Sequence, residues 1–200
     1  MLSREFIRTV SPKAKVLNII WGAFLAACVI YVFIAWIMFS QTGRAVETGT
    51  EPAELPAFLP LVFAVFAIGA LGASLVVERI MLAPTRLKDR IRQVPTAAAV
   101  LATNRNPLGQ PSAEQVRLFE GLSDEEKRLV GLVEPFQTAH IVIWAMREGI
   151  VILGLVLAIL QASFTAVLPF AAVGFVALLL KVPRLMPFYE RNFDLVRRIN

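Results

Sequence analysis

Cysteine and histidine are almost absent from this chain. The single cysteine, Cys28, excludes a disulfide within the chain, and its place in a long apolar run is typical of a thiol that behaves as a small hydrophobic group. The single histidine is His140, and the chain has no HExxH, CxxC or GxSxG motif and no glycine-rich phosphate loop. Zinc chemistry and a histidine-dependent triad therefore have little support. A haem would need an axial ligand, and His140 alone is weak evidence for one. We predict no metal, no other cofactor and no catalytic residue.

Charged residues are also scarce. They make up 18% of the chain, whereas 57% of the residues are hydrophobic and the mean hydropathy is +0.67. This composition is wrong for a water-soluble surface. About 20 apolar residues in a helix cross a bilayer core of roughly 30 Å, and four runs approach that length: 16–39, 59–77, 141–160 and 164–180. We predict an all-α, polytopic membrane protein with four transmembrane helices in two hairpins. The last of the four is short and contains Pro169, so it spans only just.

The basic residues are distributed by loop rather than gathered in one strip, which argues against nucleic-acid binding despite the net charge of +5. Lys and Arg are frequent before the first run, after the second run and in the tail. The loop between the first two runs has Arg44 alone, against Glu47, Glu51 and Glu54. The positive-inside rule then places both termini and the long middle loop in the cytoplasm. We expect a multi-pass protein of a bacterial-type cytoplasmic (inner) membrane.

Four segments follow from this topology. Residues 1–78 hold an amphipathic lead-in (1–15) and the first hairpin; residues 79–138 form a small helical cytoplasmic insert; residues 139–183 form the second hairpin; and residues 184–200 are an interfacial tail. Inside the insert, we expect a short helix over residues 96–103 and a turn over residues 104–111. Ser112 with Gln115 and Ser123 with Glu126 are capping-box patterns. They predict two helices, the second over 124 to about 134, with Pro135 separating it from the third run.

Small residues mark the predicted helix contacts, because they let helix backbones approach closely in a membrane. They place the second run in the middle of the bundle. The residues expected to pack in this way are Gly69, Gly72, Ala73, Gly149, Gly154 and Ala158.

A dense basic cluster follows the second run. Arg86, Lys88, Arg90 and Arg92 are expected to contact anionic lipid headgroups. The alternative is a docking patch for an acidic protein partner.

The run 141–160 carries two charges, Arg147 and Glu148, although a charge near a helix centre costs about 2.5–3.5 kcal/mol on insertion scales. Adjacent residues do not face one another on a helix, so at least one of the two needs a partner elsewhere. Arg147 can extend toward the cytoplasmic interface, and Glu148 could bond to Ser74, a backbone carbonyl or a water molecule. His140 lies at the predicted membrane boundary. At 100° per residue, one face of this helix gathers His140, Trp144, Arg147, Val151, Gly154 and Ala158.

The stretch 145–160, AMREGIVILGLVLAIL, resembles the second helix of the c subunits of rotary ATP synthases, in which an acid is followed by a similar I-x-G-L-V pattern. Glu148 matches that acid, and the resemblance implies that Glu148 is protonatable. It covers sixteen residues, and the glycine-rich first helix of the c subunit has no counterpart before this one.

Three functional hypotheses follow from the sequence. The favoured one is a non-catalytic subunit, assembly factor or stabilising partner of a larger membrane complex, in contact with lipids and with other membrane subunits or further copies of itself. The alternative is ion or proton translocation by an oligomer through Glu148. A membrane enzyme is the third and least favoured.

Overall fold

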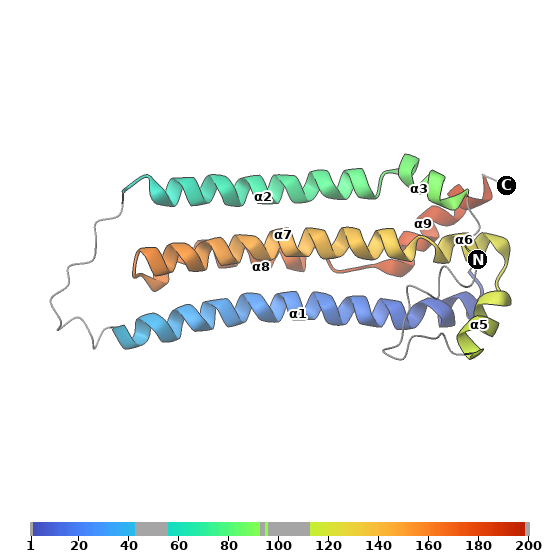
Figure 1. Ribbon diagram of the computed structural model, residues 1–200, viewed down its shortest axis with the longest axis horizontal. Helices are drawn as coiled ribbons and strands as arrows, with labels where there is room; N and C mark the ends of the chain where they lie inside the picture. Colours follow the sequence, from blue (N-terminus) through green and yellow to red (C-terminus); the bar gives the residue numbers. More distant parts are fainter. Residues whose placement is uncertain (1, 43–55, 93–94, 96–112, 199–200) are drawn as a thin grey trace. The chain divides into compact units, whose positions relative to one another are not determined.

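The computed structural model describes residues 2–42, 56–92, 95 and 113–198 (Figure 1). Within these residues the regular structure is helical and no strand occurs. The elements are α1 (Arg4–Thr42), α2 (Leu59–Met81), α3 (Pro84–Ile91), α5 (Ala113–Glu120), α6 (Asp124–Val130), α7 (Val133–Leu160), the 3-10 turn η2 (Phe164–Ala166), α8 (Leu168–Leu179) and α9 (Leu185–Arg197).

Three helices are long and apolar enough to cross a membrane: α1, α2 and α7. Large apolar side chains remain exposed along them, such as Ile19 on α1 and Ile68 on α2, both 71% exposed. Such surfaces are stable in lipid and not in water, which indicates a membrane protein. The apolar α8 is shorter: its 12 residues rise only about 18 Å. Pro169 lies in its first turn, where a missing amide donor costs nothing, and so does not interrupt it.

The contacts divide the chain into two compact units. Unit 1 comprises Met1–Ile19, Glu78–His140 and Pro183–Asn200, and unit 2 comprises Ile20–Val77 and Ile141–Val182. Unit 2 therefore holds most of the long apolar helices, and unit 1 holds most of the charged residues.

In unit 2, α7 is the most buried of the long helices. In the most apolar 18-residue stretch of α7, 44% is buried. The corresponding share is 11% in α1 and 11% in α2. Helix α8 runs back along α7, because a Cβ on Gly154 would collide with Phe170 and a Cβ on Gly174 would lie 3.0 Å from the carbonyl oxygen of Arg147. The prediction that residues 59–77 lie at the centre of the bundle is therefore wrong: α2 contributes one face, with Ala67 in a cluster around Ile150.

In unit 1, helices α3, α6 and α9 pack on one another and on the start of α1. The ring of Phe6 meets that of Tyr189 edge to face, with centroids 5.0 Å apart. The predicted capping box is confirmed, since Ser123 and Glu126 exchange hydrogen bonds at the start of α6. Glu126 also accepts a bond from the backbone N–H of Ser3 at 2.8 Å, which ties the beginning of α1 to α6.

Two predicted boundaries are wrong. Helix α6 ends at Val130, and α7 begins at Val133 and includes Pro135 in its first turn, where the ring is tolerated. Helix α1 runs without a break from the lead-in into the first apolar run, through Pro12. The predicted helix 96–103, the turn 104–111 and the cap at Ser112 lie outside the described residues.

Candidate polar site among the apolar helices

The charged face of α7 is its buried face. The six residues that helical periodicity places together are all buried: His140, Trp144, Arg147, Val151, Gly154 and Ala158. Because α7 is apolar around most of its circumference, this face is distinguished by polar and small residues rather than by hydrophobicity.

Arg147 is 3% exposed and lies inside unit 2 rather than extending to an interface. Its Nε donates to the hydroxyl of Ser74 at 3.4 Å, and its Nη1 donates to the carbonyl oxygen of Ala177 in the last turn of α8. Ser74 in turn donates to the carbonyl of Leu71 at 2.7 Å. The guanidinium therefore links α7 to both α2 and α8.

The end of α8 explains why a cation is placed there. The last four carbonyls of a helix have no partner within the helix, and the C-terminal end of its dipole favours positive charge. Besides Arg147, two indoles supply donors: Trp21 Nε1 bonds to the carbonyl of Leu178, and Trp144 Nε1 to that of Lys181, both at 3.1 Å. Backbone groups that water would satisfy elsewhere are thus satisfied by side chains inside the protein.

Glu148 has a different partner. It is half-buried, and the hydroxyl of Tyr31 on α1 donates to its Oε1 at 2.9 Å. A hydrogen bond to a carboxylate is stronger than one between neutral groups. From the sequence the expected partner was Ser74, a backbone carbonyl or a water molecule. Tyr31 was missed, although a lone tyrosine in the middle of the first apolar run was the available signal.

His140 lies in unit 1, where it is 8% exposed. Its Nδ1 is 2.9 Å from the carbonyl oxygen of Phe136, and the two rings are tilted by 35° with their centroids 4.0 Å apart. No group of three or more His, Cys, Asp or Glu side chains with metal-binding geometry occurs in the part of the chain that the structure describes.

The small residues differ in their surroundings. A Cβ on Gly69, Gly72 or Gly149 would meet nothing within 4 Å, whereas Gly154 lies directly against Phe170. Ala158 is fully buried in a cluster with Ala35 and Val167, and Ala73 is half-buried on α2.

The basic cluster after α2 separates into different environments. Arg90 approaches Glu134 at 3.8 Å, and Arg86 is exposed on α3. Lys88 and Arg92 line a pocket together with residues of α9.

No known protein family, no curated protein and no solved structure matches this chain. The short resemblance of residues 145–160 to a c-subunit helix therefore gains no support from these comparisons, and function has to be argued from the geometry.

Proposed function

We propose that this chain is a non-catalytic integral membrane protein that binds the transmembrane helix of another membrane subunit. It would act as a stabilising or assembly subunit of a larger complex. The observation that carries the proposal is an exposed stripe on α2 that contains two glycines, with no described residue within 4 Å of the position that a Cβ would take at either glycine.

This stripe consists of Val65, Gly69, Gly72 and Val76, spaced four, three and four residues apart on one side of α2. Both valines are more than half exposed, and both glycines are exposed, with nothing within 4 Å of the position that a Cβ would take at each. Lipid offers little hydrophobic drive for helix association, so close backbone approach at small residues supplies much of it. The other face of α2 packs within unit 2 through Ala67 and Ser74, which leaves this stripe for a partner.

The polar residues of α7 support the same view. Arg147 is engaged with Ser74 and with the end of α8, and Glu148 with Tyr31. A buried arginine that uses its donors inside the fold stabilises helix packing. In a structural subunit this role is sufficient to explain Arg147.

Substitution of one glycine tests the proposal. Gly72→Leu fills the stripe, and we expect it to reduce recovery of the partner subunit by about tenfold or more after mild-detergent purification, since that loss corresponds to about 1.4 kcal/mol. Gly22→Leu on α1 is the matched control, because a Cβ at Gly22 also meets nothing within 4 Å. Equal recovery of the partner from both variants, or equal loss, contradicts the proposal.

The finer topology belongs to the same proposal. Four spans with cytoplasmic termini in a bacterial-type inner membrane are supported by the positive-inside distribution of Lys and Arg. The α8 segment reaches across only with its flanking turns, because η2 and α8 together cover Phe164–Leu179.

One observation favours proton translocation as a second candidate. Glu148 is half-buried and bonded to a hydroxyl that can relay a proton, that of Tyr31. Glu148→Gln would then abolish proton flux into vesicles and leave partner recovery intact. Unchanged proton flux in Glu148→Gln, together with loss of the partner subunit in Gly72→Leu, would favour the role as a structural subunit over proton translocation.

A further inference from the structure

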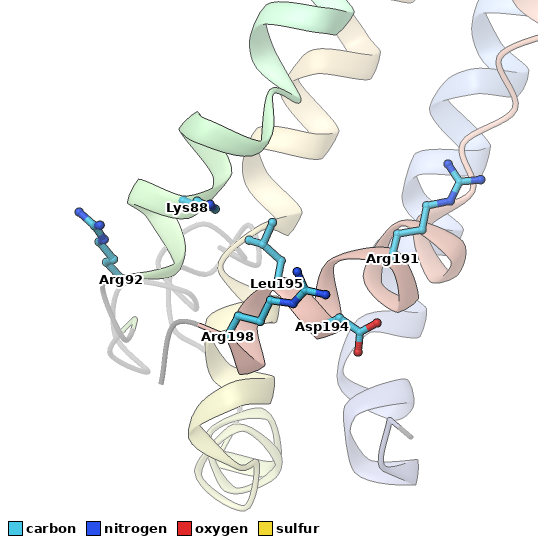
Figure 2. Close-up of a pocket in the computed structure, with 6 residues that line it drawn as sticks. All are labelled: Lys88, Arg92, Arg191, Asp194, Leu195 and Arg198. Atoms are coloured by element: carbon cyan, nitrogen blue, oxygen red, sulfur yellow. The ribbon is translucent and has the colours of Figure 1, made fainter.

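A basic pocket lies in unit 1 between α3 and α9 (Figure 2). Its volume is about 620 Å³, and the five charged residues that line it are all exposed, so it is an open pocket on the surface of unit 1. Lys88 and Arg92 come from α3 and its C-terminal cap, and α9 with its own cap supplies the other lining residues: Arg191, Asp194, Leu195 and Arg198.

The pocket has an excess of three positive charges, because four cations face one carboxylate. Among the described residues none of these four cations takes part in an ion pair, unlike Arg90, which approaches Glu134, and Lys127, which approaches Asp124. Four like charges gathered in one concavity repel one another, and a bound anion removes that repulsion. Arginine also binds phosphate oxygens in a bidentate manner.

The chain holds this pocket close to two apolar helices. Helix α3 begins three residues after the end of α2, and α9 begins six residues after the end of α8. Six residues span at most about 20 Å. With α2 and α8 in the bilayer, these short connections keep the first residues of α3 and α9 within about 20 Å of the ends of α2 and α8, and Leu195 offers an apolar wall beside the cations.

The geometry points to a binding site for the headgroup of an anionic phospholipid with two phosphodiester groups, and hence two negative charges, as in cardiolipin. Two phosphates match the excess charge better than one, and the lipid would hold together the segments that follow α2 and α8. The site does not depend on the proposed helix partner. Of the four basic residues that the sequence predicts to contact lipid headgroups, only Lys88 and Arg92 line this pocket. Arg191 and Arg198 line it as well and were not predicted.

Lipid titration of the full chain in detergent micelles, with bound lipid counted by native mass spectrometry, tests this site. The lipids are cardiolipin, phosphatidylglycerol and phosphatidylcholine. The pocket variant is Arg92→Gln with Arg198→Gln. The control variant is Arg8→Gln with Arg86→Gln, which removes the same charge from exposed positions outside the pocket.

We expect cardiolipin to bind most tightly. Each basic side chain near an anionic headgroup contributes roughly fivefold in affinity, so the pocket variant loses about 25-fold, while the control stays within about twofold of the unmodified chain. Pyrophosphate added at the same concentration should not displace the lipid.

Three results overturn the assignment. Equal losses in the two variants mean that spread surface charge binds the lipid. Displacement by pyrophosphate means that the pocket holds a soluble anion. Unchanged cardiolipin affinity in the pocket variant means that the cations serve another ligand, such as an acidic protein.

Discussion

Replacing Gly154 with alanine should destabilise the packing of α7 on α8. A Cβ at this position would collide with the Cβ of Phe170 and lie 3.0 Å from its Cγ, so either the side chain or one of the two helices has to move. Overpacking of this kind costs about 1–3 kcal/mol. Alanine also has a higher helix propensity than glycine, by about 1 kcal/mol, which offsets part of that cost.

Gly149 on the same helix separates the two effects. A Cβ there meets nothing within 4 Å, so Gly149→Ala gains the propensity without the collision. The difference between the two variants cancels propensity and isolates the contact with Phe170. We expect Gly154→Ala to be less stable than Gly149→Ala by about 1–3 kcal/mol.

Denaturant unfolding in detergent micelles, followed by tryptophan fluorescence, measures this difference. Phe170→Ala removes the Cγ and the ring but keeps the Cβ, so in a double-mutant cycle it should relieve only part of the cost of Gly154→Ala, with a measurable coupling between the two sites. Equal or greater stability of Gly154→Ala relative to Gly149→Ala refutes the described packing of α8 on α7.

Three further predictions concern unit 1. Tyr189 is buried and its hydroxyl has no hydrogen-bond partner among the described residues, so Tyr189→Phe should leave stability unchanged or raise it by about 1 kcal/mol in thermal unfolding; a loss of more than that shows a hidden partner. Burial raises the pKa of Tyr189. The folded protein therefore keeps this hydroxyl protonated at a pH at which the unfolded chain loses the proton, and the free energy of unfolding falls as the pH rises above the ordinary tyrosine pKa of about 10. The difference in stability between the unmodified chain and Tyr189→Phe should therefore change only above about pH 10, and a change near neutral pH contradicts it. Ser123→Ala removes the cap of α6 and should cost about 1 kcal/mol, whereas Ser123→Thr should cost little; equal costs would mean that the cap hydrogen bond is not the cause.

Local signals in the sequence predicted local features. Apolar runs located the long helices, a helical period of 3.6 residues gathered the buried face of α7, and the spacing of Ser123 and Glu126 gave a capping box. Each depends on residues within a few turns of one another, where backbone geometry fixes which side chains meet.

Long-range partners could not be predicted in this way. Tyr31 and Glu148 are 117 residues apart, and nothing in either helix alone selects the other. In a membrane helix the lipid-facing and protein-facing sides are both apolar, so hydropathy does not distinguish them. For that reason the small residues of α2 predict a central helix, although α7 is the more buried one.

The pocket shows the same limit. The sequence shows the cluster of basic residues on α3, but Arg191 and Arg198 join it only because α9 packs beside α3 and α6. A charge pattern predicts which face of a helix is charged, but it does not predict which other helix packs beside that face.

The central claim is that lipid surrounds the long apolar helices α1, α2 and α7 and that their charged ends face the cytoplasm. Cysteine accessibility tests this claim most directly. Starting from Cys28→Ser, single cysteines are placed at Ser163, in the turn after α7, and at Asp89, exposed on α3. In intact cells a membrane-impermeant maleimide should label Ser163→Cys and should label Asp89→Cys only after the membrane is opened. Equal labelling of both positions in intact cells, or labelling of Asp89→Cys alone, contradicts the account.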